Sequence, residues 1–149
     1  MDSRERVYRC LEFRRPDRAP RQVWALPWVG QYAAQSLEAL LKEFPVDFGG
    51  PPGALAPSGR RSGHEARKGT YTDDWGCVWE VKEDGVVGEV KQPVLADWSA
   101  LARFRPPWEM FQGANWDAAN RALESNLAGP RLFMMASTTP RPFERMQFL

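Results

Sequence analysis

Residues 69–91 read GTYTDDWGCVWEVKEDGVVGEVK. In the middle of this stretch, aromatic and apolar side chains alternate with polar or small ones, which is typical of a strand with one buried face. The apolar members of the alternation are Trp75, Cys77, Trp79 and Val81. The pattern breaks at Asp84 and Gly85, a pair that favours a tight turn because it tolerates positive φ, and resumes at Val86. The stretch therefore predicts a β-hairpin.

The register of this hairpin depends on the length of its loop. A two-residue turn would place Glu80 opposite Glu89, a like-charge pair that lowers stability unless a cation lies between the two carboxylates. A three-residue loop through Glu83, Asp84 and Gly85 avoids that pair. We expect the three-residue loop.

The overall composition is that of an ordinary globular protein. The 149 residues carry a formal net charge of +1, which argues against a dedicated nucleic-acid binder because such proteins carry an excess of basic residues. We expect a small-molecule partner instead. The charged start, MDSRER, and the lack of an apolar run of membrane-spanning length predict a cytoplasmic protein with no membrane partner.

Outside the hairpin, strands and helices alternate along the chain. Helices are expected where apolar residues recur at helical spacing after a capping residue such as Asp2, Asp97 or Asn115. The unbroken apolar run within residues 131–136 is typical of a strand in a parallel sheet covered on both faces. Further strands are expected at 22–26 and 46–48, and further helices at 36–44 and from residue 142 onward. This order predicts an α/β protein.

Three short motifs occur in a characteristic order: RERV at 4–7 with LEFRRPDRAP at 11–20, YTDDWGCVWE at 71–80, and FERM at 143–146. Together they resemble the uroporphyrinogen decarboxylase-like superfamily, and more closely its members related to corrinoid-dependent methyltransferases. The resemblance spans the whole chain but matches only the N-terminal half of the family's domain. The chain also ends at Leu149 before the helix from residue 142 completes an apolar face, and we interpret residues 1–149 as the truncated N-terminal part of such a domain.

The resemblance implies a partial (β/α)₈ barrel with the hairpin as an insertion. It further implies a fragment of an enzyme that either decarboxylates tetrapyrrole acetate groups or transfers methyl groups with a corrinoid protein as partner, and we expect the fragment alone to be inactive. The decarboxylases carry an arginine-rich loop after the first strand and a catalytic aspartate after the second. Here those positions read WALPWVGQY at 24–32 and FGGPP at 48–52, with neither residue type.

In the methyltransferase relatives, zinc is held by His and Cys ligands from the C-terminal half of the domain. This fragment is therefore expected to hold no metal itself, although zinc and a corrinoid belong to the complete protein that the resemblance implies. His64 alone forms no zinc site, because zinc takes three or four ligands and only the distant Cys10 and Cys77 could join it.

The candidate site residues follow from the barrel, whose catalytic face is built by loops after the strands. Loops at 28–32, 49–68 and 137–142 would then share one face. Arg60, Arg61, His64, Arg67 and Lys68 form a basic cluster suited to a carboxylate or phosphate, although we favour a solvated loop. The candidate substrate-binding residues are Trp28, Tyr32, Arg60, Arg61, His64, Tyr71 and Trp75.

Asp73 and Asp74 are the catalytic candidates, since adjacent acids in a pocket can act as a general base. Neighbours in a strand point to opposite faces, however, so we favour a hydrated Asp73 at the start of a strand. Trp75 and Trp79 could form the floor of a pocket for a flat ligand, or they could pack the hairpin against the barrel.

A different class of function is a non-catalytic half-barrel that pairs with another chain, including a second copy of itself. An unclosed parallel sheet exposes strand edges and apolar faces, which favours association.

Overall fold

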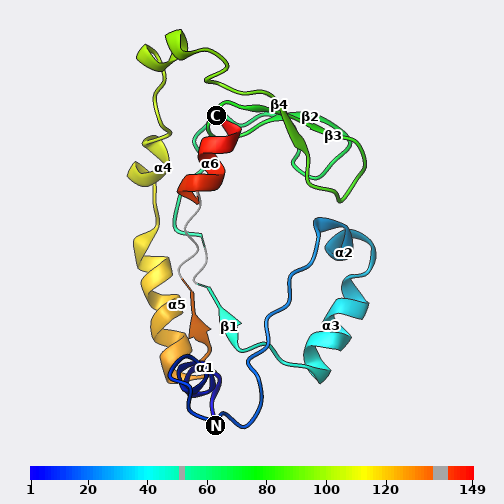
Figure 1. Ribbon diagram of the computed structural model, residues 1–149, viewed down its shortest axis with the longest axis vertical. Helices are drawn as coiled ribbons and strands as arrows, with labels where there is room; N and C mark the ends of the chain where they lie inside the picture. Colours follow the sequence, from blue (N-terminus) through cyan, green and yellow to red (C-terminus); the bar gives the residue numbers. More distant parts are fainter. Residues whose placement is uncertain (51–52, 136–140) are drawn as a thin grey trace. The chain divides into compact units, whose positions relative to one another are not determined.

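The computed structural model describes residues 1–50, 53–135 and 141–149 (Figure 1). Helices and strands are mixed, and two compact units can be distinguished by their internal contacts. Unit 1 comprises Met1–Trp24, Ala34–Ala54 and Asn115–Ser137, and unit 2 comprises Ala25–Ala33, Leu55–Ala114 and Thr138–Leu149. None of the helices in the described ranges is long and apolar enough to cross a membrane.

Unit 1 contains a parallel pair of short strands accompanied by helices. Its helices are α1 (Ser3–Leu11), α3 (Ala34–Glu43) and α5 (Trp116–Ala128), and its strands are β1 (Phe48–Gly49) and β5 (Phe133–Met134). β1 and β5 lie side by side (Figure 1) and pair in parallel, with Phe48 opposite Phe133. α1 packs on β5 through Tyr8, whose ring lies 5.5 Å from that of Phe133. The parallel pairing confirms the α/β expectation for the apolar run at 131–135.

Two of the predicted helix starts in unit 1 are confirmed by their caps. The Asp2 carboxylate accepts a hydrogen bond from the backbone N–H of Glu5 at 2.7 Å, and the Asn115 side chain accepts one from Ala118 N–H at 3.0 Å. Each cap satisfies a donor that the first helical turn cannot pair internally.

The strand predicted at 22–26 is wrong. These residues have no regular structure, and Trp24 is 79% exposed. The segment is held instead at one point, where Arg21 and Asp47 exchange hydrogen bonds: Asp47 N–H donates to the Arg21 carbonyl at 2.9 Å, and Arg21 N–H to the Asp47 carboxylate at 2.7 Å. Because β propensity reflects packing on a pleated surface, Val and Trp do not make a strand where nothing covers them.

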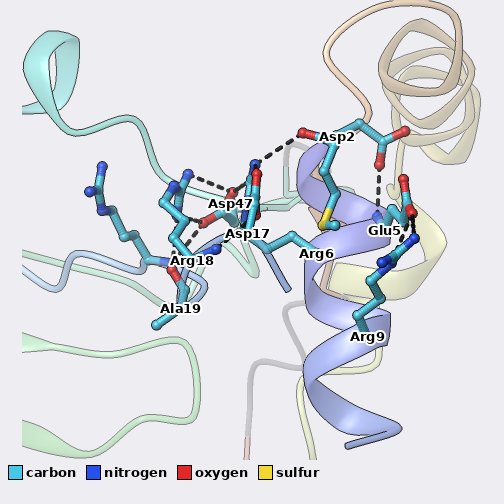
Figure 2. A network of polar contacts seen from close by, with 10 residues as sticks. Asp2, Glu5, Arg6, Arg9, Asp17, Arg18, Ala19 and Asp47 are labelled. Carbon is cyan, nitrogen blue, oxygen red and sulfur yellow. Dashed lines mark hydrogen bonds and ion pairs between the residues drawn. The ribbon is translucent and has the colours of Figure 1, made fainter. Parts of the chain in front are cut away.

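A buried ion network fixes the RRPDRAP turn to α1 and to the residue before β1 (Figure 2). Asp47 is fully buried, and its carboxylate accepts hydrogen bonds from Arg6 Nη1 at 2.5 Å and Arg18 Nη1 at 2.6 Å. Arg6 also forms a two-point contact with Asp17, at 2.6 and 2.8 Å. Burial raises the pKa of Asp47, but the hydrogen bonds from Arg18, Arg21, Ser3 and Arg6 outweigh it and hold that pKa well below 3.8.

Unit 2 contains a three-stranded antiparallel sheet with short helices. The strands are β2 (Gly69–Thr72), β3 (Val78–Val81) and β4 (Glu89–Gln92), in the order β2-β3-β4. The helices are α2 (Pro27–Tyr32), the 3₁₀ helix η1 (Trp98–Ala102), α4 (Glu109–Gln112) and α6 (Pro142–Phe148). The sheet packs its buried side chains against Phe148 and Leu149, at the end of α6.

The β3–β4 hairpin confirms the expected turn at Asp84 and Gly85, where Gly85 has φ +80°. The expected three-residue loop is wrong, because Glu80 lies opposite Glu89. Lys91 supplies the cation that this pair requires: its Nζ lies 2.6 Å from a Glu89 oxygen and 3.9 Å from a Glu80 oxygen. The first part of the stretch also forms its own strand, β2, separated from β3 by a tight turn.

Gly85 is expected to be the least replaceable glycine of the hairpin. A Cβ at this position would lie 2.5 Å from Trp28 Cα, and the Gly85 carbonyl accepts the Trp28 N–H at 2.9 Å. Gly85→Ala should therefore lower the free energy of unfolding of unit 2 by at least the roughly 1–3 kcal/mol of a strained non-glycine backbone. Chemical denaturation measures this loss.

Gly59→Ala is the matched control, because Gly59 has φ +78° but open space around its Cβ position. It isolates backbone strain from steric overlap. Equal losses for the two variants would show that α2 is not held against the hairpin tip.

Candidate functional site

A cavity of about 420 Å³ lies within unit 2. Its wall is formed by the segment before β2, the turn at 73–77, residues 106–111 and α6. The wall is mostly apolar, as is usual for small-molecule sites. Its aromatic members are Tyr71, Trp75, Trp79, Trp108, Phe111 and Phe148.

Asp73 is the polar centre of the turn between β2 and β3. Its Oδ1 accepts the backbone N–H groups of Trp75 and Cys77, both at 2.9 Å, and its Oδ2 accepts Trp79 Nε1 at 3.0 Å and Arg145 Nη1 at 2.7 Å. A carboxylate has about four acceptor sites, and these four donors fill them. The expected hydrated Asp73 is therefore wrong: the side chain is buried and organises the turn, with no lone pair left for a general base.

Arg145 of α6 lies in a cage of aromatic rings at the cavity wall. Its guanidinium carbon is 5.2 Å from the Trp75 ring centroid and 5.6 Å from that of Phe148, a cation–π arrangement. Its Nε is buried without a hydrogen-bond partner among the described residues. The ion pair with Asp73 thus joins α6 to the turn that carries Trp75.

Tyr71 and Trp79 stack at 5.8 Å with an interplanar angle of 13°. Both belong to the buried cluster that includes Cys77. Burial, with help from Glu65 and Asp73, raises the pKa of Tyr71 to about 12, and burial also raises the pKa of the Cys77 thiol. At neutral pH both groups keep their protons, so neither provides a ready nucleophile or base.

Three members of the basic cluster, Arg60, Arg61 and His64, do not converge on one anion site. Arg60 pairs with Glu109 at 2.5 Å, Arg61 pairs with Glu65, and His64 is exposed. Of these three basic residues, only Arg61 lines the cavity.

The cavity brings together some of the predicted site residues and leaves others apart. Those that line it are Arg61, Tyr71, Asp73, Asp74 and Trp75. Trp28, Tyr32, Arg60 and His64 do not line it; the rings of Trp28 and Tyr32 lie 5.4 Å apart on α2. Residues 137–140 of the predicted shared face lie outside the described residues.

Several residues that line the cavity are not among the predicted site residues, and they include Trp108, Phe111 and Arg145. Trp108 and Phe111 follow the pair Pro106-Pro107, and WEMF at 108–111 is an apolar cluster that could have indicated them. Arg145 offered no local signal, because its partner Asp73 lies 72 residues away.

The described residues contain no group of three or more His, Cys, Asp or Glu side chains placed to hold a metal ion. Cys77 is buried with its Sγ 3.2 Å from the Phe148 carbonyl, and Cys10 and His64 are exposed. This donor set does not fit zinc.

Comparison with known proteins returns no further assignment: no family model, no curated protein and no solved structure matches this chain.

Proposed function

We propose that this chain is part of a uroporphyrinogen decarboxylase-like α/β enzyme, the N-terminal half of a barrel, that acts on a small organic molecule held in the cavity of unit 2. The parallel β1–β5 pair, reached through helix α5, supports the barrel part of the proposal. In this proposal, the antiparallel sheet of unit 2, which contains the β3–β4 hairpin, is the insertion that the resemblance implies.

The single observation that carries the proposal is the aromatic cavity. Its volume of about 420 Å³ lies in the usual range for small-molecule sites. A tetrapyrrole with its carboxylate side chains is larger than the drug-sized ligands that sites of this size usually hold. The size therefore favours methyl transfer over tetrapyrrole decarboxylation.

In the methyl-transfer form of the proposal, a corrinoid-carrying partner protein either supplies the methyl group to the molecule in the cavity or accepts it from that molecule. The residues of this chain bind and orient the acceptor or donor molecule. Trp75, Trp79 and Trp108 exclude water from it, while the Asp73–Arg145 pair keeps the Trp75 turn in place. Since the donor set does not fit zinc, no step is assigned to that metal.

Ligand binding is tested by the indole N–H signals of the seven tryptophans in ¹⁵N NMR spectra. Addition of 4-methylphenol, a small apolar probe, is expected to shift the signals of Trp75, Trp79 and Trp108, which line the cavity. The signals of Trp24 and Trp116, in unit 1, should stay in place.

A pair of neighbouring variants locates the binding site. Val87→Phe places a ring at the cavity wall and should weaken binding several-fold, whereas Val86→Phe, beside it but not lining the cavity, should not. Shifts in all seven indole signals, or in none, would contradict the proposal. Because the fragment alone is expected to be inactive, ligand binding rather than turnover is the measurement that tests the proposal.

The second candidate is a non-catalytic half-barrel that pairs with another chain. It is favoured by the exposure of Phe143 and Met146 on α6, at 75% and 74%. Light scattering over a range of concentrations separates the two candidates, since a monomer at all concentrations argues against self-pairing.

A further inference from the structure

Five charged side chains line the cavity: Arg61, Glu65, Asp73, Asp74 and Arg145. Four of them form two ion pairs, Arg145 with Asp73 at 2.7 Å and Arg61 with Glu65. Within the ranges that the structure describes, Asp74 has no ion-pair partner. The cavity wall therefore carries one negative charge in excess.

Asp74 is held in place on one side and open on the other. Its Oδ1 accepts hydrogen bonds from Ser58 Oγ at 2.9 Å and Ser58 N–H at 3.2 Å, while its Oδ2 meets no donor in the described part of the chain. Arg60 is a nearby cation, since its N–H donates to Ser58 Oγ at 3.0 Å, but its guanidinium is bound to Glu109 and to backbone carbonyls. A half-buried carboxylate with a free oxygen is stabilised by a cation.

The aromatic wall is suited to the same kind of ligand. Aromatic rings attract cations over their faces, as Arg145 between Trp75 and Phe148 already illustrates. Trp75 is also stacked on Phe104, and Trp79 on Tyr71. Trp108 and Phe111 make a looser contact, with centroids 6.1 Å apart, and they are 61% and 48% exposed.

We infer that the cavity binds an organic cation, a methylated ammonium compound whose charge is balanced by Asp74 and whose methyl groups contact Trp108 and Phe111. Methylated ammonium groups are the ligands that aromatic cages recognise, because they are bulky and apolar at the surface yet charged. An organic anion fits less well, since both guanidinium groups are already paired with carboxylates. The inference rests on the proposed function only in taking the cavity to be a ligand site.

Three probes of similar size and shape test the charge preference: choline, the neutral 3,3-dimethylbutan-1-ol and the anionic 3,3-dimethylbutanoate. Their dissociation constants are obtained from the indole signals of the cavity tryptophans. Choline is expected to bind about tenfold more tightly than the alcohol, the effect of one partly desolvated cation–π contact with a counter-ion. Butanoate should bind most weakly.

Asp74→Asn should reduce the tenfold preference for choline to a few-fold, the effect of the cation–π contact alone, and leave the affinity for the alcohol unchanged. Glu83→Gln is the matched control, an exposed acid outside the cavity wall, and should change neither affinity. Equal binding of choline and the alcohol by the unmodified chain, or tighter binding of butanoate, overturns the inference while leaving the cavity a ligand site. If the cavity signals shift with none of the three probes nor with 4-methylphenol, the proposed function fails as well.

Discussion

Asp47→Asn is expected to lower the free energy of unfolding of unit 1 by about 3–5 kcal/mol, the usual loss when one partner of a buried ion pair is removed. The amide carries no negative charge, so it cannot neutralise Arg18 or Arg6, whose side chain is only 8% exposed. Its NH2 group would also face the N–H donors of these two guanidinium groups. Denaturation in urea followed by circular dichroism measures the loss. A change below 1 kcal/mol would show that the network in Figure 2 does not support unit 1.

Asp17→Asn is the matched control for this prediction. Its side chain contacts Arg6 but is 46% exposed, so water compensates for part of the lost contact and the effect should be clearly smaller. A loss as large as that of Asp47→Asn would place the critical charge at the surface rather than at the buried position.

The buried carboxylate of Asp47 makes the stability of unit 1 depend on pH in the acidic range. Because the pKa of Asp47 is lowered from 3.8 in the folded state, its contribution to stability is complete above about pH 4 and is lost as the pH falls further, toward the folded-state pKa. Asp47→Asn should flatten the pH dependence of unfolding in that acidic range. A curve identical to that of the unmodified chain would contradict the assignment.

Asp73→Ala is expected to lower the stability of unit 2 by a similar amount, about 3–5 kcal/mol, because it leaves Arg145 without its counter-ion. It also removes the acceptor for two backbone N–H groups and for Trp79 Nε1. In the Asp73→Ala variant, the near-ultraviolet circular dichroism signal of the stacked Tyr71 and Trp79 should decrease strongly.

Asp74→Asn is the control for Asp73→Ala, because it removes the charge of the neighbouring carboxylate without removing the contacts of Asp73. Asp74 bonds only to Ser58 in the described ranges, so its loss should change stability by no more than about 0.5 kcal/mol. An Asp73→Ala protein that folds as stably as the unmodified chain but binds no ligand would return Asp73 to the catalytic candidates.

Local signals in the sequence predicted much of the secondary structure. The caps at Asp2 and Asn115, the turn at Gly85 and the parallel strand at 133–134 depend on neighbours within a few residues or on an unbroken apolar run. Pro27, directly after the incorrectly predicted strand at 22–26, begins helix α2, since a proline that stops a strand is equally suited to the first turn of a helix. The partial barrel and the reaction stay predictions.

The residues that line the cavity were harder to predict from the sequence. Tyr71 and Trp75 were singled out by their pattern in the hairpin stretch, and both line the cavity. Arg145 and Trp108 were not, because their contribution depends on segments that are distant in the chain. No periodicity in the sequence reports such contacts.

The sequence by itself determined the turn at Asp84-Gly85 and the helix starts after Asp2 and Asn115, since caps and Asp-Gly pairs act within one or two turns of backbone. Only the tertiary structure decided what the charged residues do. Asp73 became a buried organiser because Arg145 lies beside it, and Glu80 tolerates Glu89 because Lys91 lies beside both. The physical reason is that the effect of a charge depends on its burial and on the sign of its neighbours, which folding alone brings together.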